Sequence, residues 1–372
     1  MKKKIVLAGG GTGGHLFPLL TVTKYLRDNY DLEKEFEFLF IGPKGEFEER
    51  LMKDASILQK NIQCGKLRRY FSLYYFFDLL KIPIGFSQSL WHVFRFMPDV
   101  VFAKGGFASV PVVLAAWIYN IPIVLHESDA VPGIANKFLG PMATLVALNF
   151  ERSQIYFNPD KTFIVGLPVK IEVLGGSKEA ARKFLSMEKQ TKPTVLFLGG
   201  SQGAQSINKK VLEVIDKLIK KYQIIHQTGT KQFEKVTKEI QHKGYKIEHS
   251  DYYPVDFIGK ELGDLLALAD VVVSRAGATS IAEIAANGKP LVLIPIQKSA
   301  NDHQRINAFE LSKAKAAVVL EEQNFSKGTL LHYLEKIDKD EKFKETLSSN
   351  IKKFYFSDSA QTLSEAILRV MK

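Results

Sequence analysis

The stretch that decides the fold is GGGTGGHLFP, Gly9–Pro18, which comes directly after the apolar run IVLA at 5–8. Gly9, Gly11 and Gly14 match the spacing G-x-G-x-x-G, in which a strand ends in a glycine turn and a helix begins. Glycine allows the tight turn and lets a ligand approach the backbone closely. The stretch therefore predicts a strand, a glycine loop and a helix at the start of an α/β domain.

The same opening occurs again in GGSQGA at 199–204. Around the two loops, short β-branched or aromatic runs alternate with helical patterns, which predicts parallel sheets covered on both faces. The predicted strands span 4–8, 37–41, 100–102, 123–126, 145–147, 163–165, 194–198, 223–227, 271–274 and 291–294. We expect two doubly wound domains that face each other, 1–168 and 169–355. A last helix over 357–372, with a Ser/Asp cap, should pack back on the first domain.

Bulk composition narrows the class of protein. The 372 residues are 46% hydrophobic and carry a formal net charge of +11, which suits an anionic partner. The only cysteine, Cys64, excludes an internal disulfide and a cysteine metal cluster. The apolar run 5–8 is too short for a secretion signal, and the longest apolar stretch, 110–125, is broken by Pro111 and Pro122. That stretch predicts a buried helix followed by a strand and not a membrane span.

The sequence of the first glycine loop fits some classes of ligand better than others. A nicotinamide enzyme requires an acidic residue at the end of the second strand, but that strand ends in Ile41-Gly42. A P-loop requires G-K-[ST] after the glycines, which is missing. A glycine turn with a purely structural role is an alternative interpretation. The remaining interpretation is a loop whose amides approach a phosphate or a sugar, with His15 at its exit as a candidate proton acceptor.

Two further stretches carry candidate site residues. Ser201 lies in the second glycine loop, where it could cap a helix or help that helix end to bind a diphosphate. In SRAGATSIAEIAANGKP, 274–290, Ser280-x-x-Glu283 reads as a capping box. A carboxylate can also accept hydrogen bonds from two ribose hydroxyls, so both roles stay open for Glu283.

These stretches occur together in one family. GGGTGGHLFP, the GGF at 105–107, HESDAVPG at 126–133, VGLPVK at 165–170, GGSQGAQSIN, SRAGATSIAEIAANGKPLVLIP and DHQRINA follow its order. From residue 4 to about 320 the chain resembles the MurG family, the UDP-N-acetylglucosamine transferases of peptidoglycan synthesis. The resemblance implies a GT-B fold, two Rossmann-like domains with an interdomain cleft. It implies no metal and no cofactor, and we see no DxD pair at a predicted strand end and no His/Asp cluster with ligand spacing.

The resemblance also implies the reaction and its place. UDP-GlcNAc binds the C-terminal domain, and lipid I, undecaprenyl-diphosphate-MurNAc-pentapeptide, meets the N-terminal domain. GlcNAc is joined β-1,4 to MurNAc with inversion, which gives lipid II. The expected location is the cytoplasmic face of the plasma membrane, the inner membrane in a cell with two. Proteins of cell-wall synthesis, cell shape and cell division are the expected neighbours.

The family's contacts carry over to positions of this chain. The residues that match donor contacts are Thr12, Gly13, Gly14, Ser201, Ile258, Ala278, Thr279, Ser280, Ile281, Ala282, Glu283 and Gln304. Among these, Ile258 matches the residue that reads uracil and Gln304 the one that contacts GlcNAc. Asp129 and Lys170 stand where the family has Asn and Arg, so their contacts are expected to change.

The chemistry implied is a direct displacement that needs a base. His15, which matches a histidine near the acceptor, is the first candidate, and Glu127 is the second because burial can raise a carboxylate's pKa. Gly105 and Gly106 could cradle the acceptor's diphosphate with their amides. Asn136 is a nearby polar candidate with a structural role.

A basic aromatic stretch, LRRYFSLYYFFDLLKIPIGF at 67–86, is the other unusual feature. It predicts an interfacial patch in which aromatic side chains enter the bilayer boundary and basic ones meet anionic headgroups. A core helix with solvated charges is the alternative, and no nucleic-acid module surrounds the stretch. The patch residues are Arg68, Arg69, Phe71, Tyr74, Tyr75, Phe76 and Phe77.

Three functions compete at this stage. The first is the lipid I transferase. The second is another GT-B enzyme, either a glycolipid glycosyltransferase or a UDP-GlcNAc 2-epimerase, which needs no acceptor. The third is a non-catalytic scaffold that binds the nucleotide sugar without transferring it.

Overall fold

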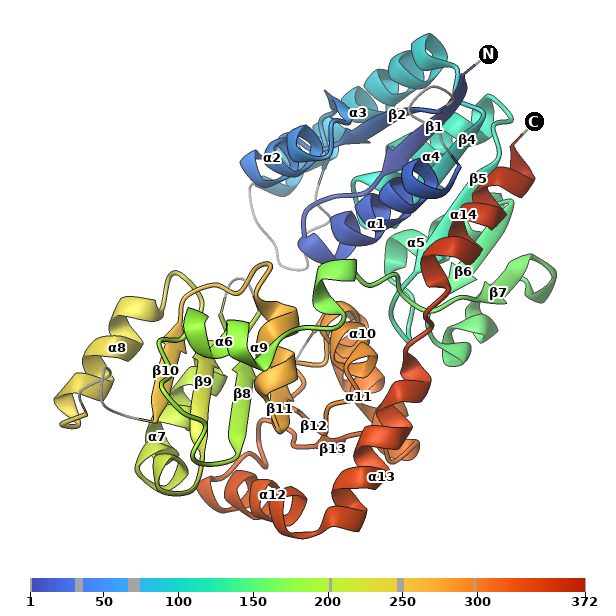
Figure 1. Ribbon diagram of the computed structural model, residues 1–372. Helices are drawn as coiled ribbons and strands as arrows, with labels where there is room; N and C mark the ends of the chain where they lie inside the picture. The colour runs from blue at the N-terminus through green and yellow to red at the C-terminus, as the bar shows by residue number, and fades with distance from the viewer. Residues whose placement is uncertain are drawn as a thin grey trace. The chain divides into compact units, whose positions relative to one another are not determined.

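The computed structural model describes residues 2–30, 36–65, 74–200, 203–245, 251–297 and 299–371. The chain divides into two compact units (Figure 1). Unit 1 comprises residues 1–168 and 356–372, and unit 2 comprises residues 169–355. Each unit is built on one parallel sheet.

Unit 1 has a seven-stranded sheet in the order β3-β2-β1-β4-β5-β6-β7. Its strands are β1 (Lys3–Ala8), β2 (Phe36–Gly42), β3 (Leu58–Asn61), β4 (Val100–Ala103), β5 (Ile123–Glu127), β6 (Leu145–Leu148) and β7 (Thr162–Ile164). Neighbouring strands are parallel throughout, with Ile5 beside Phe38 and Val100. The order of the strands reverses between β1 and β4, which makes this the switch point of the sheet.

Helices cover both faces of this sheet. They are α1 (Gly13–Asn29), α2 (Glu46–Asp54), α3 (Tyr74–Phe96), α4 (Ser109–Ile118), α5 (Ile134–Leu139) and α14 (Ser359–Val370). Ile5 and Leu7 pack in the same cluster as residues of α1 and α14, whereas Val6 and Ala8 pack with residues of α3 and α4. Successive strand residues point to opposite faces, so β1 is apolar at every position from 5 to 8.

Unit 2 has a six-stranded sheet in the order β10-β9-β8-β11-β12-β13, with its switch point between β8 and β11. Its strands are β8 (Thr194–Leu198), β9 (Gln223–Gln227), β10 (Tyr252–Val255), β11 (Val271–Ser274), β12 (Leu291–Leu293) and β13 (Val318–Val319). Its helices are α6 (Lys178–Phe184), α7 (Gln205–Lys221), α8 (Phe233–His242), α9 (Leu262–Leu268), α10 (Ala278–Ala286), α11 (His303–Lys313), α12 (Lys327–Lys339) and α13 (Glu341–Ile351). All ten predicted strands of the chain are present, and β3, β10 and β13 are additional ones.

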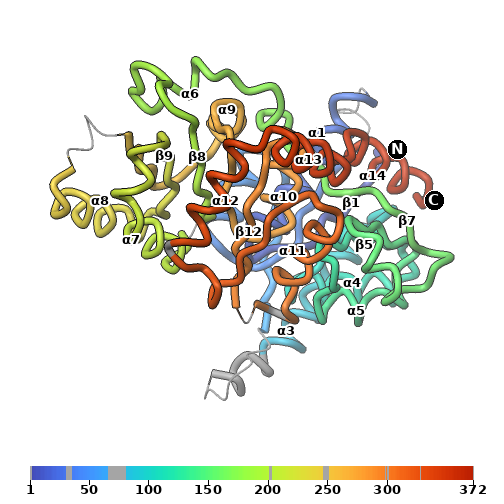
Figure 2. The backbone as a smooth tube through the Cα atoms, turned by 90° about the horizontal axis from the view of Figure 1, so that it is seen from below, coloured from blue at the N-terminus to red at the C-terminus, as the bar shows by residue number. Residues whose placement is uncertain are grey.

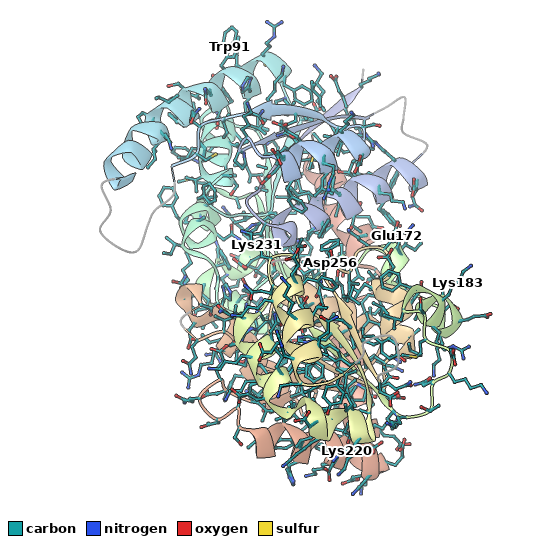
Figure 3. The ribbon with its side chains drawn as sticks, turned by 90° about the vertical axis from the view of Figure 1, so that its left-hand side faces the viewer. Trp91, Glu172, Lys183, Lys220, Lys231 and Asp256 are labelled. Carbon is teal, nitrogen blue, oxygen red and sulfur yellow. The ribbon has the colours of Figure 1, made fainter. Side chains whose placement is uncertain are left out.

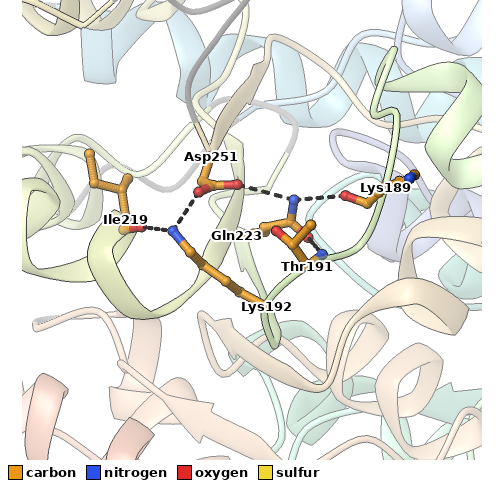
Figure 4. Close-up of polar contacts among 6 residues, drawn as sticks. All are labelled: Lys189, Thr191, Lys192, Ile219, Gln223 and Asp251. Carbon is orange, nitrogen blue, oxygen red and sulfur yellow. Dashed lines mark hydrogen bonds and ion pairs between the residues drawn. The ribbon is translucent and has the colours of Figure 1, made fainter.

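Polar side chains fasten the amino ends of three strands of unit 2 (Figure 4). The Gln223 side chain donates from Nε2 to the Lys189 carbonyl and to Asp251 Oδ1, 3.1 Å each, and accepts from the Thr191 amide at 3.2 Å. Lys192 Nζ lies 2.6 Å from Asp251 Oδ2. These contacts join the segments that lead into β8, β9 and β10, at the edge opposite the glycine loop.

The last helix returns to unit 1, as Figures 1 and 2 show by the course of α14 beside α1. Leu363 and Ile367 are fully buried in the α1 face of the core. The Ser359 hydroxyl donates to the Val165 carbonyl at 2.6 Å. The N-cap residue of this helix is Asp358, in agreement with the predicted Ser/Asp cap, but its side chain makes no capping hydrogen bond.

Because α14 fills one face of the core of unit 1, we expect Leu363→Ala to destabilise that unit by about 2–5 kcal/mol, the usual cost of truncating a buried leucine. Arg369→Ala, on the exposed side of the same helix, should change it by at most about 0.5 kcal/mol. Urea unfolding of both variants measures the difference. Equal effects of the two substitutions would show that the helix is not part of the core.

Candidate active site

The switch point of unit 1 brings two glycine loops together. The first loop follows β1 and leads into α1, with Thr12 at the N-cap position and His15 in the first turn. Thr12 Oγ1 lies 3.0 Å from Nδ1 of His15. The second loop follows β4, and a methyl group built on Gly106 would lie 3.2 Å from Cε1 of His15. Gly106 also has a φ of +80°, so both its conformation and its neighbour favour glycine.

One amide of the first loop is already occupied. The Gly11 amide donates to Oε1 of Glu48, from α2, at 2.9 Å, and the Glu48 side chain is buried. A carboxylate at this position repels a phosphate. The first loop is therefore better suited to a sugar than to a diphosphate, which also argues against a dinucleotide at this site.

Glu127, at the end of β5, is held by three hydrogen-bond donors. Its Oε1 accepts from the Asp129 amide at 2.8 Å, and its Oε2 accepts from the Gly133 amide at 3.2 Å and from Asn136 Nδ2 at 2.8 Å. Burial, followed by the charge of Asp129, raises the pKa of Glu127 to about 7, and Lys104 opposes the rise. Both carboxylate oxygens thus hold the turn after β5.

Lys104 and His126 lie beneath the same turn. Lys104 is completely buried and donates to the Ser128 hydroxyl. Burial lowers its pKa to about 8. His126 Nε2 lies 2.9 Å from the Gly166 carbonyl, which assigns the ring proton to Nε2. Burial keeps the pKa of His126 far below its ordinary value, so this ring is neutral.

The switch point of unit 2 has the same arrangement of loops. Gly200 and Gly203 have φ of +75° and +76°, and the loop leads into α7, whose N-cap residue is Ala204. Ser201 itself lies outside the described residues. The prediction that it caps a helix therefore lies outside the described residues, and α7 begins at Gln205.

Arg275, directly after β11, links the loops of unit 2. Its guanidinium lies 2.5 Å from the Ser206 hydroxyl in α7, 2.6 Å from Glu322 Oε1 after β13, and 2.9 Å from the Ile294 carbonyl after β12. Asn307 adds a bond from Nδ2 to the Ala276 carbonyl, 3.1 Å long. The carboxyl ends of four strands are therefore fixed to one another.

Glu283 is not a capping residue. Helix α10 begins at Ala278 after Gly277, so Ser280 is inside the helix and the predicted capping box is wrong. Thr279, Ile281 and Ala282 lie in the same first two turns. Burial raises the pKa of Glu283 to about 7, and the positive charge of Lys170 opposes this rise. Within the part of the chain that the structure describes, no donor to the Glu283 carboxylate is found, in contrast to Glu127.

The remaining predicted donor residues lie on neighbouring loops of unit 2. Gln304 is in the first turn of α11, and its Oε1 accepts from the Ile296 amide at 3.1 Å. That bond leaves its Nε2 as the donor for a ligand. Ile258 is buried in the loop between β10 and α9. Of the predicted donor residues, Thr12, Gly13, Gly14 and Asp129 belong to unit 1, and the others belong to unit 2.

The predicted membrane residues are only partly within the described chain. Arg68, Arg69 and Phe71 lie outside it, and Tyr74–Phe77 form the start of α3 without described side chains. Further along, α3 exposes Trp91 and Phe94, which are 58% and 56% exposed (Figure 3 labels Trp91). Phe94 lies 6.2 Å from Tyr119, at the end of α4, between ring centroids. We call Trp91, Phe94, Met97, Trp117, Ile118 and Tyr119 the apolar patch; all six are exposed.

The sequence patterns did not identify three buried or partly buried charged residues: Glu48, Lys104 and Arg275. Lys104 and Arg275 each directly follow a strand, with a glycine one residue further on for Lys104 and two residues further on for Arg275, and that position was the available signal. Over the described ranges, no group of three or more His, Cys, Asp or Glu side chains could hold a metal ion. No helix in those ranges is long and apolar enough to cross a membrane.

Two parallel-sheet units with glycine loops at both switch points form a GT-B fold, and the family models that match this chain show that it is a glycosyltransferase. Residues 5–148 match the glycosyltransferase family 28 N-terminal domain, and residues 194–363 match the corresponding C-terminal domain. The chain belongs to the MurG family within these transferases.

Relatives along the whole length support this assignment. The UDP-N-acetylglucosamine–N-acetylmuramyl-(pentapeptide) pyrophosphoryl-undecaprenol N-acetylglucosamine transferase 2 of Bacillus cereus is 36% identical over 98% of this chain and 100% of its own. The transferase of the same name in Clostridium tetani is 35% identical over 99% and 98%.

Solved structures share the fold at lower identity. MurG of Acinetobacter baumannii has a TM-score of 0.76 at 22% identity, covering 99% of both chains. A UDP-GlcNAc 2-epimerase of Neisseria meningitidis, bound to UDP-GlcNAc, has a TM-score of 0.71 at 14% identity, covering 99% of this chain and 100% of its own. At such identities the likeness shows the fold alone, so it gives the epimerase alternative no particular support.

Proposed function

We propose that this chain transfers GlcNAc from UDP-GlcNAc to the MurNAc 4-hydroxyl of lipid I, inverting the anomeric centre and forming lipid II. The observation that carries the proposal is the full-length similarity to relatives named for this transfer. The glycine loops at both switch points agree with it, because ligands of open α/β sheets bind beyond the carboxyl ends of the strands.

The donor binds unit 2 in this proposal. The amino ends of α7 and α10 direct amides and positive dipole ends toward the diphosphate, together with Ser201. Glu283 accepts hydrogen bonds from the ribose hydroxyls. Among the described residues, no other donor to its carboxylate is found. Ile258 contacts uracil, and Gln304 donates to GlcNAc from Nε2. Arg275 positions the loops without contacting the donor.

The acceptor meets unit 1. Gly105 and Gly106 hold its diphosphate, and His15 removes the proton of the MurNAc hydroxyl as that oxygen attacks C1 of GlcNAc. The bond between C1 and the phosphate oxygen breaks, and UDP leaves with the electron pair. If Nδ1–H of His15 donates to Thr12, Nε2 is the nitrogen that accepts the proton. Thr12, Gly13 and Gly14 contact the transferred sugar, and no cofactor is needed.

We infer that the apolar patch contacts the membrane. Its aromatic side chains come from two helices that pack side by side in unit 1, and Lys81 and Arg95 of α3 supply positive charge. Such a combination binds the boundary of an anionic bilayer peripherally. The acceptor is a lipid, so this surface keeps unit 1 where the substrate is, at the cytoplasmic face.

The transfer itself is tested with radiolabelled UDP-GlcNAc and a short-chain lipid I analogue. We expect a labelled disaccharide lipid. Label in UDP-ManNAc without acceptor would establish the epimerase instead. Binding of UDP-GlcNAc with no product at all would establish the scaffold.

Donor affinity should depend on pH through Glu283. Ionised Glu283 accepts two ribose hydroxyls, and with a pKa of about 7 it becomes protonated as the pH falls. UDP-GlcNAc affinity should therefore fall by up to about ten-fold between pH 8 and pH 6. In Glu283→Gln it should be weaker at pH 8 and independent of pH. Calorimetric titration measures this, with Glu188→Gln as an exposed control, and a pH-independent wild type would contradict the role.

Membrane binding should depend on the apolar patch. Trp91→Ser and Phe94→Ser should each weaken binding to phosphatidylglycerol vesicles by about ten-fold, because each removes an aromatic ring from the bilayer boundary. Phe309→Ser, in α11 of unit 2, is the matched control, since Phe309 is 59% exposed. Co-sedimentation gives the comparison. A similar loss in all three variants would mean that the patch is not the contact.

A further inference from the structure

The cluster beneath the acceptor loops contains a positive charge that no assigned role uses. Lys104 follows β4 immediately, and its amide donates to the Ala8 carbonyl of β1 at 2.9 Å. Its Nζ donates to the Ser128 hydroxyl and lies 3.5 Å from the His126 carbonyl. Burying a lysine in this way is costly unless it meets opposite charge, and Glu127 and Asp129 are its two acidic neighbours.

The bonds to Glu127 favour its ionised form, because a carboxylate is the stronger acceptor. Three N–H donors converge on its two oxygens, from the Asp129 amide, the Gly133 amide and Asn136. A glutamine amide would present an N–H group to at least one of these donors, and a protonated carboxyl group would be a weaker acceptor for them. The negative charge of Asp129 disfavours ionisation of Glu127, and the charge of Lys104 favours it.

The protonation state of Glu127 affects the Gly105–Gly106 turn through Asn136. Because Nδ2 of Asn136 donates to Glu127, the amide orientation is fixed, and Oδ1 is buried with no hydrogen-bond partner among the described residues. A methyl group on Gly105 would collide with the amide of Asn136. Gly106 in turn lies against the ring of His15. Contacts therefore link Glu127 to Asn136, Asn136 to the Gly105–Gly106 turn and that turn to His15, and Lys104 acts on Glu127 through its charge.

We propose that Lys104 is a positioning residue of the transfer reaction. It supplies the buried positive charge that Glu127 and Asp129 together require. In this way it holds Asn136, the Gly105–Gly106 turn and His15 in the geometry that receives the acceptor. The proposal rests on the proposed function. It also explains Asp129, which stands where the resemblance leads us to expect a neutral Asn. The extra negative charge at 129 is balanced by the lysine at 104.

A double-mutant cycle tests the balance of charge in the full-length protein. Lys104→Met keeps most of the side-chain volume and removes the charge, Asp129→Asn removes the charge of Asp129, and a third variant combines them. Lys137→Met, an exposed lysine in α5, is the control. Acceptor kinetics are measured with a short-chain lipid I analogue at saturating UDP-GlcNAc, so that titration of Glu283 does not enter, and UDP-GlcNAc affinity is measured separately.

We expect Lys104→Met to lower kcat/KM for the acceptor by 10-fold or more, on the order of the effect of misplacing a reacting group. UDP-GlcNAc affinity should stay within about two-fold. Adding Asp129→Asn should recover a large part of the loss. An additive cycle, or acceptor kinetics unchanged in Lys104→Met, would overturn the proposal.

The pH profile separates this role from a general loss of folding. The groups that face Glu127 with charge are Lys104, after β4, and Asp129, after β5, while the adjacent His126 is neutral. Transfer should be lost as the pH falls and Glu127 becomes protonated. The acid limb should move to higher pH in Lys104→Met, to lower pH in Asp129→Asn, and lie between these limits in the double variant. Coincident acid limbs in all four proteins would contradict the proposal.

Failure of the proposed function has a different signature. A wild-type protein that transfers nothing to the lipid I analogue would contradict the proposed function itself. The same four proteins, compared by thermal unfolding, would then still show whether the charges at 104 and 129 are coupled. Additive unfolding midpoints would overturn the charge pairing, and non-additive ones would support it.

Discussion

The reversal of strand order in each parallel sheet is the constraint on which the rest of the structure depends. Where β1 lies beside β4, and β8 beside β11, the connections leave in opposite directions, so no helix covers the gap between the two loops. Glycine-rich loops can approach each other there, and in unit 1 this sets Gly106 against His15. The amino-end edge of the second sheet is instead fastened by Gln223 and Asp251. The candidate binding residues therefore lie at one end of each sheet, where the strands have their carboxyl ends.

Each unit has a glutamate with a pKa of about 7 whose charge interacts with that of a lysine: Glu127 with Lys104 in unit 1, and Glu283 with Lys170 in unit 2. The two carboxylates differ in their hydrogen bonds. Both pKa values are raised mainly by burial and lowered by the nearby lysine. Glu127 accepts three hydrogen bonds from its own unit, so its charge stabilises the loop. Glu283, beside Lys170, has no such donors among the described residues and is suited to a ligand's hydroxyls. Similar electrostatics thus support a structural role in one unit and a binding role in the other.

The sequence predicted the central strands because their signal is local. Runs such as IVLA and VVVS are buried on both faces and need no partner to be recognised. The missed strands have no such signal: β3 reads LQKN, β10 contains Pro254 at a sheet edge, and β13 has two residues. Lys104 and Arg275 were missed because their partners lie far away in sequence. The capping box failed because a matching pattern does not fix where a helix begins.

The choice of base follows from how the two candidates are bonded. The Glu127 carboxylate already accepts three hydrogen bonds, and protonation makes it a weaker acceptor for the bond from Asn136, which lies against the turn at Gly105. Protonating Glu127 would thus disturb the site at the moment of reaction, even though its pKa near 7 suits a base. The contact of His15 with Thr12 involves Nδ1, so a proton on Nε2 leaves that contact in place. The hydrogen bonds of Glu127 therefore fit a role in holding the loop, and His15 stays the proposed base.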